Sequence, residues 1–130
     1  MAKSLFLLFN HQLTSEQEKD ARASLQITNI QPLPPELKAL WGQIPPHLLE
    51  IVQHLQPIRP WLAAQAQPDD YMLIQGDFGA CFLMVNFAFK NKLIPIYSTT
   101  VRKAVEEIAE DGSIKLIHRF KHQIFRNYGR

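Results

Sequence analysis

The stretch Met72-Leu73-Ile74-Gln75-Gly76-Asp77-Phe78-Gly79 decides the fold of this chain, together with Ile94-Pro95-Ile96-Tyr97-Ser98-Thr99-Thr100 further on. In each stretch a short apolar strand runs into polar or glycine residues, and a strongly apolar helix is predicted between the two. This strand–turn–helix–strand order is the building block of a parallel sheet. In open α/β sheets, ligands bind beyond the carboxyl ends of the strands. The sequence therefore predicts a ligand site at Gln75–Asp77 and Ser98–Thr100.

The rest of the chain supplies further elements of an α/β fold. Leu5–Phe9 is a fully apolar run, which is typical of a central parallel strand, and residues 25–30 alternate as a strand nearer the sheet edge does. Thr14-Ser15-Glu16-Gln17 is a capping-box pattern that predicts a surface helix. In the proline-rich middle, short helices are predicted, one of them beginning at Pro46.

The predicted helix over residues 78–91 is apolar nearly all round. Its core face is predicted from the spacing of five residues, Phe78, Cys81, Phe82, Val85 and Phe89. Such a helix is either deeply buried or lies at a subunit interface, and in a chain this small the interface is favoured. The sequence therefore predicts a homodimer.

The carboxyl-terminal part allows two interpretations. Val101, Ala104, Val105 and Ile108 fit a helical stripe, whereas Asp111-Gly112 is a hairpin turn signal followed by the alternating residues 113–120. We favour an antiparallel hairpin.

Composition and charge narrow the class of protein. The 130 residues are 46% apolar and 20% charged, as expected for one globular domain over residues 1–130. No run approaches the roughly 20 apolar residues of a membrane span, and the single Cys81 fits a reducing, cytoplasmic compartment. Residues 113–130 carry five Lys or Arg and no acid, which favours contact with phosphates, although a solvated face is the alternative.

Several residues at the predicted edge could carry chemistry. His11 follows the first strand and could move protons near neutral pH. Arg102 and the hydroxyls of Ser98, Thr99 and Thr100 suit a phosphate or a ribose. Backbone N–H groups at a helix start suit anions. The candidate ligand-binding residues here are Asn10, Gln75, Gly76, Asp77, Phe78 and Gly79. Asp77 could instead serve only as the helix N-cap, and for Phe78 we favour a place in the core. No catalytic triad, metal site or cofactor is predicted.

The motifs together resemble a small CRISPR-associated family. They are Phe9-Asn10-His11-Gln12-Leu13-Thr14, Leu40-Trp41-x-x-Ile44-Pro45-Pro46, residues 74–79, Ile94–Thr100 with Arg102, and His118-x-Phe120-x-His122-x-x-Phe125-Arg126-x-Tyr128. The family is among the stand-alone, CARF-related, ring-nuclease-like proteins of type III systems, and the resemblance spans the whole chain.

The resemblance implies a Rossmann-like, CARF-like single domain, with a mainly parallel sheet flanked by helices and the hairpin at its carboxyl end. It implies a homodimer that binds a cyclic oligoadenylate, most plausibly cyclic tetra-adenylate, and cuts it to linear di-adenylates by metal-independent 2′-hydroxyl attack. On that chemistry His11 would serve as acid or base and Arg102 would hold the phosphate, with Gln75–Gly79, Thr99 and Thr100 cradling the ring. No membrane or DNA partner is expected.

Two alternatives stay open at this point. The same pocket could bind the ring without cleaving it, as a sensor or sponge. The basic carboxyl-terminal stretch could instead bind CRISPR RNA or an effector complex, with a strong salt dependence.

Overall fold

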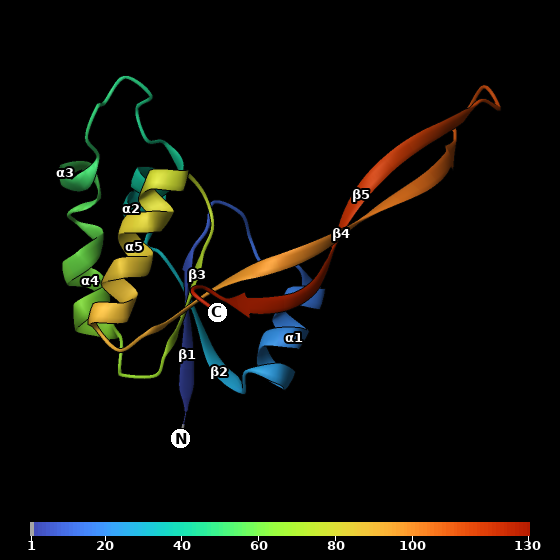
Figure 1. Cartoon of the computed structure of the whole chain (residues 1–130). Helices are drawn as coiled ribbons and strands as arrows, with labels where there is room; N and C mark the ends of the chain where they lie inside the picture. The colour runs from blue at the N-terminus through green and yellow to red at the C-terminus, as the bar shows by residue number, and fades with distance from the viewer. Residues whose placement is uncertain (1) are drawn as a thin grey trace.

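A computed structural model describes residues 2–130 as a mixed five-stranded sheet with helices on both faces (Figure 1). The strand order is β2-β1-β3-β4-β5; β1 to β4 are parallel, and β5 is antiparallel to β4. The α/β class and the carboxyl-terminal antiparallel hairpin are therefore confirmed. The elements are β1 (Lys3–Leu8), α1 (Ser15–Ser24), β2 (Ile27–Pro32), α2 (Pro35–Gly42), α3 (Val52–Leu55), α4 (Ile58–Gln65), β3 (Tyr71–Ile74), α5 (Phe78–Lys90), β4 (Ile94–Ile108) and β5 (Ile114–Asn127).

The sheet has a hydrophobic core on each face, because alternate side chains of a strand point to opposite sides. Phe6 and Met72 point to the face covered by α2, α3, α4 and α5, where they pack with residues such as Trp41 and Leu62. Leu5, Leu7, Leu73 and Ile96 point to the other face, where Ala21 of α1 covers them. The apolar runs of β1 and β3 thus have the pattern of strands buried on both sides.

The amino-terminal half of α1 forms as the sequence predicts. Thr14 is the N-cap; its hydroxyl accepts a hydrogen bond from Gln17 N at 3.1 Å, and Gln17 Oε1 accepts one from Thr14 N at 3.0 Å. This capping box satisfies two N–H groups that the helix itself leaves unpaired.

The predicted core face of α5 is wrong for Phe78, Phe82 and Phe89, whereas Cys81 and Val85 are partly buried against the core. The buried residues are Ala80, Met84, Phe87 and Ala88, whereas Phe78 is 95% exposed and Phe82 is 67% exposed. A helix that is apolar all round has two stripes with the same spacing, so periodicity cannot tell which stripe meets the sheet.

The predicted helix beginning at Pro46 is also wrong. Residues 43–51 are irregular, and Leu49 is 98% exposed. The apolar residues with helical spacing there are Leu48, Leu49, Val52 and Leu55, of which only Leu55 lies in the core. A short helix therefore forms only around it, as α3.

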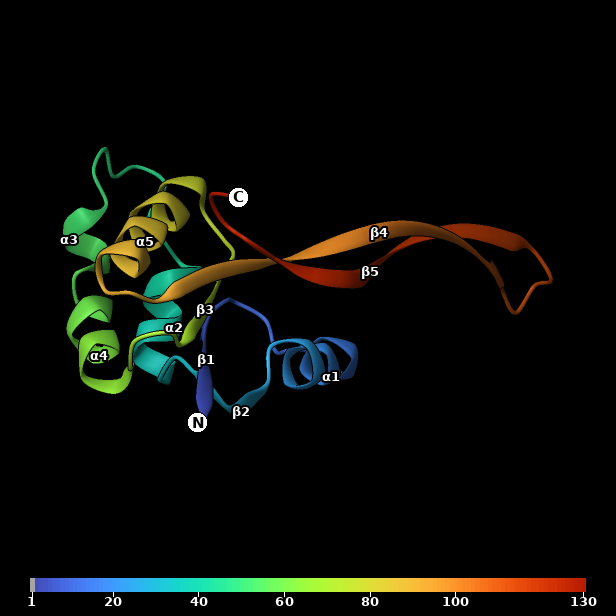
Figure 2. The ribbon, with the colours of Figure 1, turned by 60° about the horizontal axis from the view of Figure 1, so that its bottom comes forward.

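The hairpin is much longer than the other strands. β1 and β3 end at Leu8 and Ile74, but β4 continues past the same edge and pairs with β5 as far as Ile108 and Ile114. We call residues 99–124 the arm. Figures 1 and 2 show it projecting well beyond the sheet and its helices.

The turn at the tip of the arm has the predicted residues. Gly112 has φ of +83°, and its N–H donates to Ala109 O at 2.9 Å. The N–H and hydroxyl of Ser113 both donate to Asp111 Oδ1, and these hydrogen bonds lower the pKa of the Asp111 carboxyl.

Candidate functional site

The carboxyl edge of the sheet contains a crevice between β1 and β3. The chain passes from β1 to β2 on one side and then to β3 on the other, so the direction of the strand order reverses at β1. Such a switch point is where open α/β sheets bind ligands. A small pocket of about 190 Å³ lies here, lined by Asn10, Trp41, Gly42, Ile44, Gly76 and Asp77. The Trp41 indole donates to Gln75 O at 3.0 Å and holds the turn after β3 against α2.

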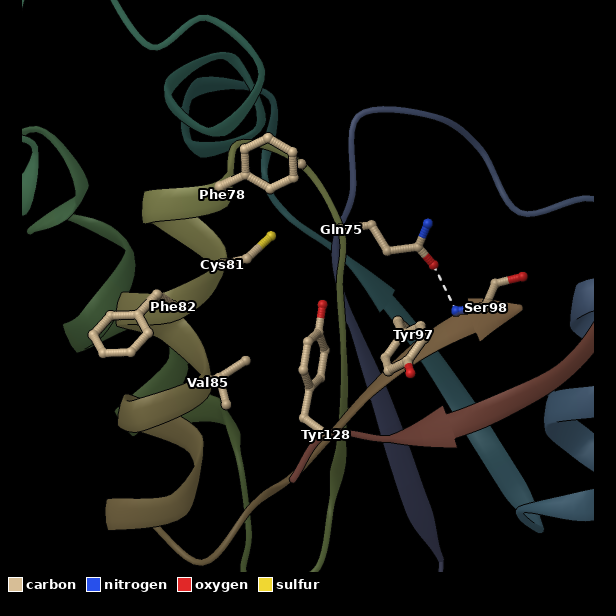
Figure 3. A pocket seen from close by; sticks show the side chains of 9 residues that line it. Gln75, Phe78, Cys81, Phe82, Val85, Tyr97, Ser98 and Tyr128 are labelled. Atoms are coloured by element: carbon tan, nitrogen blue, oxygen red, sulfur yellow. Dashed lines mark hydrogen bonds between the residues drawn. The ribbon is translucent and has the colours of Figure 1, made fainter. Parts of the chain in front are cut away.

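A larger pocket of about 470 Å³ lies beside it, between α5 and β4 (Figure 3). It is lined by Gln75, Gly76, Phe78, Cys81, Phe82, Val85, Tyr97, Ser98 and Tyr128. The rings of Tyr97 and Tyr128 lie 4.8 Å apart, and the Tyr128 hydroxyl donates to Ile74 O at 2.6 Å. The pocket is thus mainly aromatic and apolar, with polar groups at the strand ends.

Two ionisable groups in this pocket are neutral at ordinary pH. Burial raises the pKa of the Tyr128 hydroxyl to about 12, and burial also raises the pKa of the Cys81 thiol. Neither group is therefore prepared to act as a base or as a thiolate nucleophile.

A hydrogen-bonded chain of Asp20, His122 and Ser98 links α1, β5 and β4 behind the strand end. His122 Nε2 lies 2.7 Å from Asp20 Oδ2, and His122 Nδ1 lies 2.6 Å from Ser98 Oγ. The His122 side chain is only 5% exposed. An ionised Asp20 can only accept, so Nε2 carries a proton, and in the neutral imidazole Nδ1 then accepts from the Ser98 hydroxyl.

The pKa of Asp20 is lowered, which agrees with an ionised Asp20 carboxylate as the partner of His122. Burial raises the pKa of this carboxyl, but hydrogen bonds from Ser24 and His122 and the positive charge of a protonated His122 lower it, and the net shift is downward. The Ser24 hydroxyl donates to Asp20 Oδ1 at 2.6 Å.

Ser98 also joins this chain to the turn after β3. Its backbone N–H donates to Gln75 Oε1 at 2.7 Å (Figure 3), and Gln17 Nε2 lies 3.4 Å from its hydroxyl. The pairing of β4 with β5 is irregular between Ser98 and Thr100, where the Thr99 hydroxyl bonds to the backbone of Ile124. The strand irregularity therefore separates the sheet proper from the arm.

A third pocket, also of about 470 Å³, lies between the start of α1 and the base of the arm. It has the cationic side chains Lys103, Arg119 and Lys121 on one side and the first residues of α1, including Glu16, on the other. Arg119 is already paired with Glu107 at 2.7 Å.

The structure brings some of the predicted site residues together. Gln75, Gly76, Phe78 and Ser98 line the aromatic pocket, and Asn10, Gly76 and Asp77 line the crevice pocket, so Gly76 belongs to both. Phe78 is exposed at the pocket, and the prediction that it joins the core is wrong. Asp77 is the N-cap of α5, accepting from Ala80 N at 3.0 Å, as the alternative interpretation had it.

Other predicted residues lie apart. His11 is exposed, contacts the Phe9 ring edge-to-face at 5.4 Å, and lines a pocket beside β2. Thr100 lines the third pocket, and Arg102 lies exposed on the arm. Gly79 lies in the first turn of α5.

Sequence reasoning missed Asp20, His122, Tyr97 and Tyr128. Tyr97, His122 and Tyr128 lie in the motifs that carry the family resemblance, but no role was predicted for them; Asp20 lies in none, and 102 positions separate it from His122. No local spacing indicates that pair.

Two further observations bear on the class of protein. Within residues 2–130 no group of three or more His, Cys, Asp or Glu side chains is placed to hold a metal ion. No helix in this range has the length and apolar character that crossing a membrane requires.

The fold and site define an α/β protein with a polar and aromatic pocket at the carboxyl edge of its sheet and a long β-hairpin arm. The chain belongs to the uncharacterized protein MJ1673 family, whose model matches residues 3–126. The uncharacterized protein MJ1673 of Methanocaldococcus jannaschii is 52% identical over 124 residues, which cover 95% of each chain. No solved structure matches.

Proposed function

We propose that this protein is a CARF-like ring nuclease that binds a cyclic oligoadenylate at the carboxyl edge of its sheet and cleaves it without a metal ion. Cyclic tetra-adenylate is the ring that we favour. The family resemblance of the sequence motifs supports the ligand class. The observation that carries the proposal is the Asp20–His122–Ser98 chain, because it is a proton-accepting group beside the pocket at this edge.

The lining of the pocket suits an adenylate. Phe78, Tyr97 and Tyr128 offer aromatic faces on which adenine rings can stack. Backbone N–H groups at the start of α5 and the amide of Gln75 can hydrogen-bond phosphate and ribose oxygens. The ring would therefore lie over Gln75–Gly79 with its sugar–phosphate edge toward Ser98–Thr100.

Cleavage would begin at a ribose 2′-hydroxyl. Ser98 Oγ would take the 2′-hydroxyl proton while its own proton passes to His122 Nδ1, and Asp20 would stabilise the imidazolium. The 2′-oxygen then bonds to phosphorus, the bond to the 5′-oxygen breaks, and a 2′,3′-cyclic phosphate remains. The leaving 5′-oxygen takes up a proton from solvent, because His11 lines a separate pocket beside β2. Arg102 lies on the exposed arm and does not line this pocket, so the backbone N–H groups at the start of α5 are the candidate contacts for the phosphate charge.

The test is incubation of the purified protein with radiolabelled cyclic tri-, tetra- and hexa-adenylate in excess EDTA. One ring should be converted to short linear adenylates that end in a cyclic phosphate. Ser98→Ala should lower the single-turnover rate by about a factor of 10²–10⁴. Ser113→Ala, which removes an exposed hydroxyl at the tip of the arm, should leave the rate unchanged.

Each other outcome has a definite meaning. A ring that binds but stays intact contradicts catalysis and supports a sponge or sensor. If none of the three rings binds, the CARF-like function is wrong. Equal rates for Ser98→Ala and wild type would show that the hydrogen-bonded chain has no part in cleavage. The cleavage rates of His11→Ala and Arg102→Ala would then be compared with that of wild type.

A second candidate function is the binding of linear RNA, favoured by the base of the arm. Arg102, Lys103, Arg119 and Lys121 lie there without an acidic residue among 99–105 and 117–124. Reversing the charges of Lys115, Arg119 and Lys121 should then abolish binding, and affinity should fall steeply with salt. His11→Ala should have no effect on such binding.

We also propose that the protein is a homodimer. Two exposed apolar surfaces on the chain could form the contact: the outer stripe of α5, with Phe78, Phe82 and Phe89, and the arm.

A further inference from the structure

Within residues 2–130 the arm packs against neither hydrophobic core, and only its base contacts α1. No residue of 99–124 belongs to either core cluster. Four large apolar side chains of the arm are between 61% and 79% exposed; they are Ile108, Ile114, Leu116 and Phe120. An isolated two-stranded hairpin is marginally stable at best in water. The free part of the arm therefore needs a partner surface.

These four side chains lie on one face of the arm. Cross-strand partners share a face, and the pairs Ile108↔Ile114, Glu106↔Leu116, Ala104↔His118 and Arg102↔Phe120 follow one another at steps of two residues. We call these eight residues the arm face. The opposite face carries Lys103, Arg119, Glu107 and Lys115, among which Arg119 and Glu107 already pair.

Charge is distributed unevenly along the arm. The base has four cationic residues and no acid, as described above. Residues 106–116, at the tip, contain Glu106, Glu107, Glu110 and Asp111 but only one cation, Lys115. Because the base of the arm is cationic and its tip is acidic, opposite charges face each other when two copies of the arm lie antiparallel.

The arm face fits a copy of itself in that arrangement. With the two-fold axis at the Ala104–His118 pair, Arg102 of one copy faces Glu106 of the other. Phe120 correspondingly faces Leu116, and the small Ala104 side chain lets the strands approach at the axis. Within residues 2–130 neither Arg102 nor Glu106 has an ion-pair partner. A surface that meets its own copy in this way is an isologous interface.

We propose that two copies of this chain dimerise through their arm faces, packed antiparallel about an axis at Ala104 and His118. This inference deepens the homodimer proposed above by naming its surface and its ion pair. The α5 stripe offers apolar area but no self-complementary charge pair, so we favour the arm. The acidic tip would repel RNA phosphates, so RNA is a less suitable partner for the whole arm face than a second copy of the chain.

The arrangement has a consequence for the candidate site. The base of each arm adjoins the carboxyl edge of its own sheet, because β4 continues past that edge. Because α1 already covers His122 on this face, the tip of the partner's arm would lie beside Thr100, at the third pocket between the start of α1 and the base of the arm.

The experiment measures the mass of the full-length protein in solution by sedimentation equilibrium at several concentrations, without ligand. Wild type should be a dimer. Arg102→Glu and Glu106→Arg should each raise the dimer Kd by about tenfold or more, because each places two like charges together. The double variant Arg102→Glu/Glu106→Arg should restore dimerisation, because the pair is re-formed with its signs exchanged. Glu36→Arg and Lys38→Glu on α2 are the matched charge controls and should remain dimeric.

Three results would overturn the proposal. They are a wild type that stays monomeric, single variants as dimeric as wild type, and a double variant as weak as the singles. Loss of the dimer only in Phe82→Glu would assign the contact to α5. Far-UV circular dichroism of each variant checks that it is folded. Ring cleavage is assayed separately, so a dimer without cleavage contradicts only the proposed activity, and a monomer that cleaves contradicts only the dimer.

Discussion

The hydrogen bonds of Asp20 give the fold a pH dependence that a single substitution can reveal. The folded-state pKa of this carboxyl lies below its ordinary value of 3.8. The ionised form therefore stabilises the fold above pH 3.8, and this contribution disappears as the pH falls through the lowered pKa. Asp20→Asn should lower the free energy of unfolding at pH 7 by about 1–3 kcal/mol.

Urea unfolding of wild type and Asp20→Asn at a series of pH values measures this difference. The gap between the two proteins should narrow as the pH falls below 3.8. Glu110→Gln, at the exposed tip of the arm, should show no such gap at any pH. A gap that stays constant down to the lowest pH would contradict the role assigned to Asp20.

Gly76 is required by its backbone angle and by the closeness of Trp41. Its φ is +157°, and a Cβ there would lie 3.0 Å from Trp41 Nε1, whose ring is buried in the core. Gly76→Ala should lower the free energy of unfolding by about 2–4 kcal/mol, through backbone strain and overpacking.

The matched control for Gly76 is Gly112→Ala. Gly112 also has a positive φ, of +83°, but no atom lies within 4 Å of the added Cβ. Because Gly112 lies at the tip of the arm, which contributes no core residue, the strain there should lower the free energy of unfolding of the body by less than about 1 kcal/mol. Equal losses in the two variants would show that Trp41 does not resist the change.

For the helix α5, two substitutions can show which of its two apolar stripes packs against the sheet. Met84→Ala removes a fully buried side chain and should lower the free energy of unfolding by about 2–5 kcal/mol. Phe82→Ser changes a side chain that is mostly exposed and should stay within about 0.5 kcal/mol of wild type. Urea unfolding compares the two, and the reverse order would restore the core face that the periodicity favoured.

The helices and strands also show how much of the fold could be predicted from the sequence. The strands β1 and β3, the capping box of α1 and the turn at Asp111-Gly112 depend on residues close together, so their patterns predicted them. The stripe of α5 and the loop after Pro46 were mispredicted, because burial by distant elements chooses between equivalent local patterns.

At the scale of the molecule, the arm and the body should be separable. No core residue lies within residues 99–124. Replacing residues 105–117 by Asn-Gly, a favoured two-residue hairpin turn, should therefore change the free energy of unfolding of the body by no more than about 1 kcal/mol. The same variant should be monomeric in sedimentation, because Glu106 and Leu116 are gone. A large loss of stability would mean that the arm supports the body.

The α/β class, the polar strand ends at Gln75–Asp77 and Ser98–Thr100, and the carboxyl-terminal hairpin could all be predicted from the sequence. Each depends on propensities and spacings within a dozen or so residues. Only the tertiary structure decided the Asp20–His122–Ser98 chain, the exposed stripe of α5 and the projection of the arm. The reason is physical: the sheet brings α1, β4 and β5 together across about a hundred positions of sequence, and hydrogen bonds and burial over that separation leave no local pattern.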